Sequence, residues 1–459
     1  MDNYKKNNYI FNIYKYMKHI LVLTICTLLI GIISANTKRK IDEREEKDTN
    51  LYDYTKYSYV RKNINSTGED FDSSGSNESA LYFDDQEYIV DYPNIDKSGD
   101  YSQDKENEHY CFNSAVLVQG GDAKMRMHDG TIDSSGRGGN GICTTNNGKV
   151  GVYRTNINTN KPYSKGLHST YGGSIVGVNM NIKTKGDNSE ALYTYKGVSH
   201  IICNACELST EGSNSSLIHS NGNIMAYSST HGTASNAQIA VVRGEGIASI
   251  EGQSALKANG KGMIGVDNAG VLLYKVDQKE EEGTTTFYCQ DSELSILPDS
   301  PYYKSAPMFF VTNTDDSKIN IENCVFNYGS GVFLKQGGTN VWGEPGKNCG
   351  KTEMYLHRQT INGDISMDDC SEMVLNLVDS HITGVINPNC GKLVINIYKN
   401  SSINLRGDSC YTEINNDGGI LNNGTHNWID QNSKYSYFGC CFGEYIKTSF
   451  FLIMLIILL

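Results

Sequence analysis

A glycine recurs every 24 or 25 residues through the middle of this chain. A short β-prone run follows each glycine, as in Ile224-Met-Ala-Tyr, and runs of this length bounded by Gly, Asn and Ser are typical of strands. An aliphatic residue stands about six positions before each glycine. The glycines are Gly148, Gly173, Gly197, Gly222, Gly246 and Gly270, and the aliphatic residues are Ile142, Leu167, Leu192, Leu217, Val241 and Ile264.

The fixed recurrence favours a solenoid over a sandwich of two sheets. A sandwich also has short strands, but nothing in it requires a constant repeat. One coil of a parallel β-helix does, because each turn of the chain stacks like residues on the turn before it. We therefore predict an all-β fold, a right-handed parallel β-helix solenoid over residues 109–430, with roughly eleven or twelve coils.

Four cysteines repeat with a shorter period near the end of this region. Cys349, Cys370, Cys390 and Cys410 are 21, 20 and 20 residues apart. In a β-helix they share one ladder with neighbours about 4.8 Å apart, which suits a disulfide. The pattern predicts either Cys349–Cys370 with Cys390–Cys410, or Cys370–Cys390 with the outer two free. A zinc site is the alternative, but a linear stack does not make a tetrahedron.

Cys203 and Cys206 form a C-x-x-C motif directly after a predicted strand. Thioredoxin-like redox chemistry needs such a pair at the N-terminus of a helix, and zinc needs a second pair. The sequence offers neither, so we predict a local disulfide across a turn.

Both ends of the chain resemble processing signals. Residues 1–35 combine basic residues with an apolar run from Ile20 to Ile33, which predicts a secretory signal peptide, with an uncleaved signal anchor as the alternative. Residues 431–459 end in ten apolar residues, too few to span a bilayer. Small residues before a polar spacer make Gly439, Cys440 and Cys441 candidate GPI-attachment sites, with a simple hydrophobic tail as the alternative.

An exported chain is consistent with the 13 cysteines, because disulfides persist in oxidising compartments. Five sequons supply candidate N-glycosylation sites, at Asn65, Asn77, Asn214, Asn400 and Asn423. The formal net charge of −12 argues against nucleic acid as a partner, since phosphate binding needs clustered cations. The expected location is therefore extracellular, at the cell surface, with membrane contact through the C-terminal tail.

Residues 36–108 differ in composition from the rest. They carry 10 basic and 19 acidic side chains, lack cysteine, and have mostly scattered tyrosines as their apolar content. A segment of this kind buries too little surface to offset its ordering entropy. We predict a disordered acidic stalk.

The region from Gly270 to Asn416 resembles the repeat module of secreted microbial surface proteins with a right-handed, pectate-lyase-like β-helix, often described as adhesin-like. The stretches that carry the resemblance are Met308-Phe-Phe-Val-Thr-Asn-Thr, Gly331-Val-Phe-Leu, Asn340-Val-Trp-Gly, Ile361-Asn-Gly-Asp-Ile and Leu405-Arg-Gly-Asp-Ser. With the glycine-spaced coils before Gly270, it extends over about two thirds of the chain. It implies the fold, and it assigns no catalytic residue.

Parallel β-helices also include polygalacturonase-like hydrolases, which resemble one another in an Asp pair, a Gly-His-Gly and an Arg-x-Lys. The Asp pairs 315–316 and 368–369 occur here, but the other two motifs do not. Acidic pairs in an acidic protein are usually solvated turn residues. His168, His200 and His219 stand at different offsets from their coil glycines, which favours surface or turn positions over a metal site. We therefore predict no enzyme, no cofactor and no metal ligand.

The expected function is that of a secreted, surface-tethered binding or adhesion protein. Its expected partner is a surface polysaccharide or another cell-surface protein, and tyrosines at 153, 193, 195 and 274 are candidates for stacking on sugar rings. A polysaccharide lyase or glycoside hydrolase on the same fold is one alternative. A structural coat protein without a ligand is another.

Overall fold

The computed structural model describes residues 58–101, 110–278, 283–344 and 346–432. They belong to one compact unit, Tyr57–Leu459. The named elements are all β-strands, and they form five sheets in which strands pair in parallel. The three largest sheets have 12, 14 and 10 strands and are called sheets A, B and C below.

The strands of sheet A are β1 (Ser58–Lys62), β4 (Glu78–Phe83), β7 (Val116–Gln119), β10 (Ile142–Thr145), β13 (Leu167–Ser169), β16 (Leu192–Thr194), β19 (Ile218–Ser220), β22 (Ala240–Arg243), β25 (Val271–Tyr274), β28 (Phe309–Thr312), β31 (Val332–Gln336) and β34 (Asp364–Met367).

The strands of sheet B are β2 (Ser66–Thr67), β5 (Glu87–Asp91), β8 (Lys124–His128), β11 (Lys149–Tyr153), β14 (Ser174–Val178), β17 (His200–Asn204), β20 (Asn223–Tyr227), β23 (Ile247–Glu251), β26 (Thr285–Gln290), β29 (Thr314–Glu322), β32 (Gly350–His357), β35 (Glu372–Val378), β37 (Lys392–Tyr398) and β40 (Glu413–Asp417).

The strands of sheet C are β3 (Asp70–Ser73), β6 (Asn94–Lys97), β9 (Thr131–Ser134), β12 (Asn156–Thr159), β15 (Asn181–Thr184), β18 (Glu207–Thr210), β21 (His231–Ala234), β24 (Ala255–Ala258), β27 (Glu293–Ile296) and β30 (Val325–Asn327). Two small sheets follow near the C-terminal end, formed by β33 (Thr360–Asn362), β36 (His381–Gly384), β38 (Ser402–Leu405) and β41 (Ile420–Asn422), and by β39 (Ser409–Tyr411) and β42 (Trp428–Asp430).

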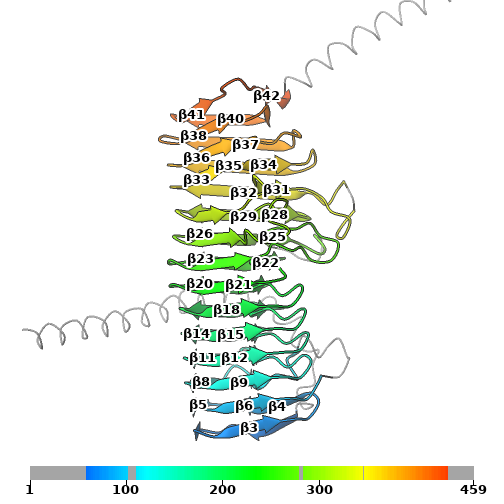
Figure 1. The fold of residues 1–459 in the computed structure, drawn as a ribbon, viewed down its shortest axis with the longest axis vertical. Helices are drawn as coiled ribbons and strands as arrows, with labels where there is room; N and C mark the ends of the chain where they lie inside the picture. Colours follow the sequence, from blue (N-terminus) through cyan, green and yellow to red (C-terminus); the bar gives the residue numbers. More distant parts are fainter. Residues whose placement is uncertain (1–57, 102–109, 279–282, 345, 433–459) are drawn as a thin grey trace, which may run out of the picture. The chain divides into compact units, whose positions relative to one another are not determined.

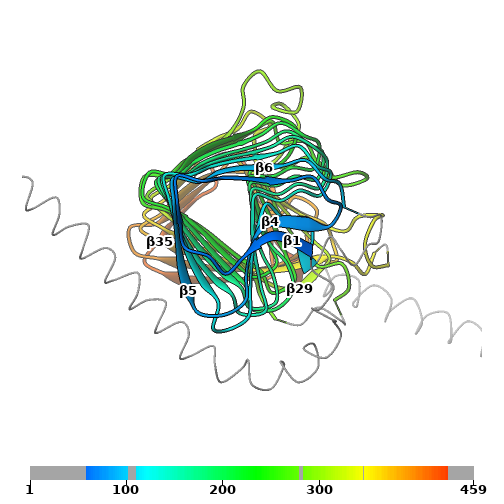
Figure 2. The same cartoon turned by 90° about the horizontal axis from the view of Figure 1, so that it is seen from below.

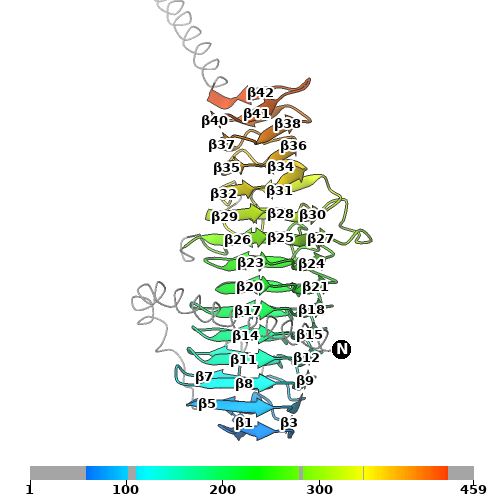
Figure 3. The same ribbon diagram turned by 90° about the vertical axis from the view of Figure 1, so that its left-hand side faces the viewer.

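The chain visits sheets A, B and C in turn and then starts the next coil. Each strand pairs with its counterpart one coil later, so that Ile142 of β10 lies beside Leu167 of β13, and Leu167 beside Leu192 of β16. Successive coils stack along one axis (Figures 1 and 3), and the view down that axis shows the strand sets superposed (Figure 2). This is the predicted parallel β-helix. Sheet B takes twelve of its 14 strands, β8 to β40, from the region for which eleven or twelve coils are predicted.

Alternation within each strand builds the core. In β11 the side chains of Val150 and Val152 are buried while Lys149, Gly151 and Tyr153 are not, because successive residues of a strand face opposite sides. Valine and isoleucine at the inward positions pack against the same position one coil on, as Val150 does with Ile175. The core is therefore a set of ladders that run along the solenoid.

The glycine pattern is confirmed at four of its six positions. Gly148, Gly173, Gly222 and Gly246 each stand just before a strand of sheet B, and a Cβ at Gly222 would lie 2.5 Å from the carbonyl oxygen of Ser199. That contact admits only glycine.

Gly197 and Gly270 do not belong to this ladder. His200 pairs with Ser174, so Ser199 holds the ladder position and Gly197 precedes it by two residues. Gly270 precedes β25 in sheet A instead. The segment 259–270, inserted between β24 and β25, lengthens that coil, so that a glycine 24 residues after Gly246 no longer falls before a strand of sheet B.

In the later coils, the aliphatic ladder of sheet A also differs from the one predicted from the spacing. After Leu192 it continues through Ile218, Ala240 and Val271. Leu217 and Val241 stand one residue away from it, and Ile264 lies in the inserted segment with 89% of its surface exposed. Spacing alone cannot distinguish adjacent apolar residues, since both are buried on opposite sides of the strand.

The expectation of a disordered stalk over 36–108 is wrong for residues 58–101. They form β1 to β6, the first strands of sheets A, B and C. In β3, Asp70 and Asp72 face solvent while Phe71 is buried, so the acidic residues alternate with core residues. Composition averages over this alternation, which is why the segment resembles a disordered one.

Ten cysteines of the described residues pair into five disulfides. Cys349–Cys370 and Cys390–Cys410 confirm the first of the two predicted pairings, with Cα–Cα distances of 5.8 and 5.1 Å. Cys203–Cys206 is the predicted local disulfide, at 6.0 Å. Two further bonds, Cys111–Cys143 and Cys289–Cys324, join neighbouring coils and were not predicted as pairs.

The predicted signal peptide at 1–35, the stalk residues 36–57 and 102–108, and the candidate GPI sites Gly439, Cys440 and Cys441 lie outside the described residues. Within the described residues, no helix has the length and apolar character needed to cross a membrane.

Candidate functional site

The best-formed polar site lies where the chain passes from sheet C to sheet A in four successive coils. Because Leu167, Leu192, Ile218 and Ala240 are register partners, the residues before them also stack. The residues two positions before these four aliphatic residues form a buried ladder of polar side chains. The residues one position after them form a second ladder, on the outer side of sheet A. The buried polar ladder is Lys165, Glu190, Ser216 and Gln238, and the outer ladder is His168, Tyr193, His219 and Val241.

A stack of buried serines fixes the turns that carry this ladder. The backbone N–H of Ser164 donates to Oγ of Ser189, and that of Ser189 donates to Oγ of Ser215, both at 2.9 Å. Each serine directly precedes a member of the polar ladder. Lys165 and Glu190 are therefore held at equivalent places one coil apart, which at the spacing of parallel strands is about 4.8 Å.

The two ladders border a pocket of about 160 Å³, called the turn pocket below. Its lining residues are Tyr163, Lys165, Asn188, Glu190, Tyr193, Asn214, His219, Gln238, Val241 and Met263. Lys165 and Glu190 are its two side chains of fixed opposite charge, and they are 2% and 5% exposed. Burial of this degree is unusual for charged residues and requires partners.

Glu190 is the electrostatic centre of the turn pocket. Nδ1 of His219 donates to Oε1 of Glu190 at 3.2 Å, and Nζ of Lys165 lies 3.8 Å from Oε2. Burial raises the pKa of the Glu190 carboxyl, but Lys165 and then His219 together outweigh burial and hold the pKa below its ordinary value. The carboxylate is therefore ionised at neutral pH.

Two polar atoms in the turn pocket have no hydrogen-bond partner among the described residues. They are Oε2 of Glu190, an acceptor, and Nε2 of Gln238, a donor on a side chain that is 1% exposed. Leaving buried polar atoms unpaired costs about 1–3 kcal/mol each. The pocket therefore presents one unused acceptor and one unused donor to whatever enters it.

Aromatic and apolar groups form the walls of the turn pocket. Nζ of Lys165 lies 5.0 Å from the ring centroid of Tyr193 and 5.6 Å from that of Tyr163. Tyr193 also makes edge contacts with His168 at 4.9 Å and with His219 at 5.1 Å. These contacts fix the tyrosine rings, so the aromatic wall is preformed.

The inserted segment 259–270 closes one side of the turn pocket. Met263 of this segment lines the pocket, and Nζ of Lys261 donates to Oγ of Ser213 at 3.2 Å. Met263 also packs against a small apolar cluster on the outer side of sheet A, in which Trp342 stacks on Tyr274 with 4.0 Å between ring centroids. The inserted segment, which interrupts the regular spacing of the glycines, is thus also the segment that completes the turn pocket.

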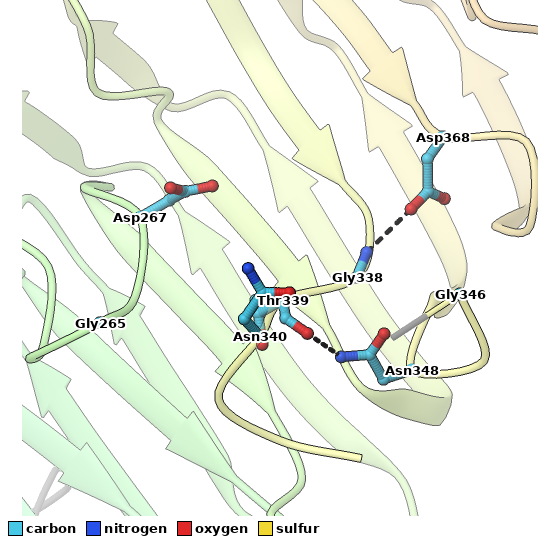
Figure 4. Close-up of a pocket in the computed structure, with 8 residues that line it drawn as sticks. All are labelled: Gly265, Asp267, Gly338, Thr339, Asn340, Gly346, Asn348 and Asp368. Atoms are coloured by element: carbon cyan, nitrogen blue, oxygen red, sulfur yellow. Dashed lines mark hydrogen bonds between the residues drawn. The ribbon is translucent and has the colours of Figure 1, made fainter. Parts of the chain in front are cut away.

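A larger crevice of about 330 Å³ lies between the segments around Gly265 and Asn348 (Figure 4). Its carboxylates are already engaged: Asp267 pairs with Lys335 at 2.5 Å, and Asp368 accepts from the N–H of Gly338 at 2.8 Å. Its described lining residues include no aromatic side chain. The smaller turn pocket is therefore the better candidate.

The four tyrosines predicted to stack on sugars do not share one face. Tyr153 lies in β11 of sheet B, with the Arg154 guanidinium 4.2 Å from its ring centroid. Tyr274 is covered by Trp342. Tyr193 lines the turn pocket and its ring is nearly parallel to that of Tyr195, 6.2 Å away.

The histidines are arranged differently from the expectation. His168 and His219 occupy the same ladder, with Tyr193 between them, whereas His200 lies in sheet B. His168 also contacts the Cys111–Cys143 disulfide, with Nδ1 3.4 Å from Sγ of Cys111. Within the described residues, the two clusters with metal-ligand spacing both contain cysteines that are already joined in disulfides.

The Asp pairs and the sequons occupy separate places. Asp315 and Asp316 are in β29, where they bond to Lys275 and Thr284, and Asp368 is in the larger crevice. The five sequon asparagines are all at least partly accessible to solvent, and Asn214 lines the turn pocket.

Sequence reasoning missed Lys165, Glu190 and Gln238. A usable signal was present: Lys165 and Glu190 have opposite charge and stand 25 residues apart, each two positions before a ladder leucine. Gln238 could not be found in this way, because its coil is shorter.

Comparison of the chain with protein-family models, with curated proteins and with solved structures finds no match. The resemblance to adhesin-like surface proteins therefore stays a prediction.

Proposed function

We propose that this chain is a cell-surface binding protein whose turn pocket holds a carbohydrate. The observation that carries the proposal is a pair of buried atoms without a hydrogen-bond partner among the described residues, Oε2 of Glu190 and Nε2 of Gln238, in one pocket beside Tyr193. A hydroxyl group both donates and accepts hydrogen bonds, so a ligand rich in hydroxyls can satisfy both atoms.

The walls of the turn pocket suit the apolar C–H groups of a sugar ring. Val241 and Met263 offer apolar contact, and Tyr163 and Tyr193 offer ring faces and edges. Pockets that combine a mostly apolar or aromatic wall with a few fixed polar groups are the common form of small-molecule sites. The C–H face of a sugar ring matches such a wall.

Export and tethering complete the proposal. The five disulfides are consistent with an oxidising compartment. The signal-like residues 1–35 and the candidate attachment residues Gly439, Cys440 and Cys441 suggest a surface location with a GPI anchor. Release from intact cells by a phosphatidylinositol-specific phospholipase tests the anchor, and retention of the apolar tail in the membrane fraction would contradict it.

A glycan array tests the binding function. The full-length protein, kept soluble in a mild detergent, should bind a defined group of glycans, and Gln238→Leu should abolish that binding while disulfide mapping stays unchanged. Gln253→Leu, at an exposed turn, is the matched control and should bind normally. Release of reducing sugar from pectin would favour the lyase or hydrolase instead, and absence of binding to any glycan would favour a structural coat.

A further inference from the structure

The buried polar ladder is interrupted between Glu190 and Gln238. Oε2 of Glu190 and Nε2 of Gln238 have no hydrogen-bond partner among the described residues. Ser216 stands between them in the ladder, but its Oγ donates to the carbonyl oxygen of Ile218 at 3.0 Å. Nζ of Lys165 lies 3.8 Å from Oε2 of Glu190, which is an ion pair but too long for a hydrogen bond. A polar group between Glu190 and Gln238 would continue the ladder.

Amide groups form such a ladder elsewhere in this molecule. Nδ2 of Asn396 donates to Oδ1 of Asn376 at 2.8 Å, and Nδ2 of Asn415 donates to Oδ1 of Asn396 at 3.0 Å. These three asparagines are register partners in β35, β37 and β40, so each is one coil from the next. An amide can therefore bond to both adjacent coils, because its N–H and its C=O point in opposite directions.

One amide from a ligand has the donor and the acceptor that this interruption needs. The ionised carboxylate of Glu190 accepts hydrogen bonds only, and Nε2 of Gln238 donates only. Their ladder positions are two coils apart, which is about 9.6 Å along the solenoid. A single hydroxyl joins partners no more than about 5.6 Å apart, so an amide suits the wider interval better.

The walls and the size of the turn pocket suit a small amide. Val241 and Met263 line it and offer an apolar contact for a methyl group. Its volume of about 160 Å³ is well below the roughly 300–1,000 Å³ that is typical for drug-sized ligands. The pocket therefore admits one substituent with part of its sugar ring. Among the substituents of sugars, the acetamido group combines an N–H, a C=O and a methyl group.

We infer that the turn pocket recognises the acetamido group of an N-acetylated amino sugar at the end of a glycan. The N–H of this group donates to Oε2 of Glu190, its C=O accepts from Nε2 of Gln238, and its methyl group packs against Val241 and Met263. The free amine can donate to Glu190 as an ammonium group, but it leaves Gln238 without an acceptor and brings no methyl group. This inference rests on the proposed carbohydrate-binding function and names its ligand class.

Matched glycans that differ only at the 2-position of their terminal residue test the inference. The four forms carry an acetamido group, a hydroxyl, an O-acetyl ester or a free amine, and each is titrated against the full-length protein in detergent. The ester keeps the carbonyl and the methyl group but lacks the N–H, so it isolates the contact with Glu190. We expect the acetamido form to bind at least tenfold more tightly than each of the other three.

Ser216→Asn tests the interrupted ladder within the chain itself. It supplies an amide between Glu190 and Gln238, and it should weaken binding of the acetamido form at least tenfold. Ser216→Ala also removes the sequon at Asn214 but adds no amide, and it should bind as the wild type does. Unchanged binding by a folded Ser216→Asn would contradict the ladder argument. If Ser216→Asn does not fold, the four titrations of the wild type still decide the matter.

The titrations separate failure of the inference from failure of the proposed function. Tighter binding of the free amine would mean that Glu190 selects a cation, and equal binding of the hydroxyl or ester form would mean that the amide is not recognised. Either result overturns the inference while carbohydrate binding stands. Stronger competition by a peptide with N-acetyl-lysine than by the acetamido sugar would overturn the assignment to a glycan. If the wild type binds no glycan on the array, the proposed function itself fails.

Discussion

Tyr163 has a left-handed backbone conformation, with φ of 64°, which a bulky side chain rarely adopts. The equivalent residues of the neighbouring coils are Gly138, Asn188 and Asn214, also with positive φ, and glycine and asparagine tolerate it. Tyr163 is held by the Arg137 guanidinium, 4.6 Å from its ring centroid. Backbone strain of this kind tends to persist at functional sites.

Tyr163→Asn should therefore weaken glycan binding without weakening the fold. The change relieves about 1–2 kcal/mol of backbone strain and loses about 0.5–1 kcal/mol of cation–π contact. The free energy of local opening at β13, measured by hydrogen exchange, should rise by up to about 1 kcal/mol. Tyr195→Asn is the control at an ordinary φ and should show no such gain; a large loss at Tyr163→Asn would contradict the strain argument.

Glu190 should make stability depend on acid pH. Its folded pKa lies below the ordinary value of about 4.3, so its contribution is complete above that pH and is lost as the pH falls through the folded pKa. Glu190→Gln removes a buried carboxylate from beside the Lys165 ammonium group and should cost about 3–5 kcal/mol at pH 7.

Thermal unfolding at pH 7 and pH 3 measures this dependence. The difference between wild type and Glu190→Gln should be smaller at pH 3 than at pH 7, because the contribution of the carboxylate is lost as the pH falls towards and through its lowered folded pKa. Glu207→Gln, at an exposed position, should show no difference at either pH. A gap of equal size at both pH values would mean that the charge of Glu190 contributes nothing.

How far the sequence predicts the site depends on register. Ladder positions follow from spacing only while coils keep the same length, which holds from Leu167 to Leu192. Beyond that, coils of different length place Gln238 and Met263 in the pocket with no fixed interval. Spacing also reports the position along the chain but not the side of the strand, so His168 and His219 looked unrelated although they share a ladder.

Among the elements, the disulfides act as links between neighbouring coils. Cys349 and Cys370 close a loop of 21 residues, which in the chain-entropy model contributes about 3 kcal/mol. Replacing both with serine should lower the hydrogen-exchange protection of β32 and β35. The same change at Cys390 and Cys410 should move the loss to β37 and β40.

Peptide mapping without reduction gives an independent check on these pairs. Each cysteine should be found linked to its partner in the adjacent coil. Pairing of Cys349 or Cys370 with a distant cysteine such as Cys143 would mean that the coil register is wrong. The predicted spacing was sufficient here because the coils from 349 to 410 are nearly equal in length.

The first coils show where composition misleads. β5 alternates exposed Glu87 and Ile89 with buried Tyr88 and Val90, and the buried residues continue the ladders of β8. Lys97 of β6 is itself buried, with Nζ donating to the carbonyl of Gly99 at 2.7 Å, and burial lowers its pKa to about 8. A net charge counted over the segment cannot detect an alternation of period two.

At the scale of the whole molecule, each coil packs only on its neighbours. Stability in such a solenoid is close to a sum of coil and interface terms, so local damage should stay local. Phe287 of β26 suits a test, because it is fully buried and its ring lies 5.3 Å from that of Phe309, edge to face. Tyr288 is its neighbour on the outer side of the same strand, 39% exposed.

Phe287→Ala should cost about 3–5 kcal/mol, because it leaves a cavity that rigid sheets cannot close. Hydrogen exchange should show protection lost in β23, β26 and β29 and kept in β8 and β37, since those strands share no interface with the cavity. Tyr288→Ala should leave protection almost unchanged. A uniform loss of protection from β5 to β40 would instead show that the coils unfold as one cooperative unit. A core substitution far from the turn pocket would then also weaken ligand binding there.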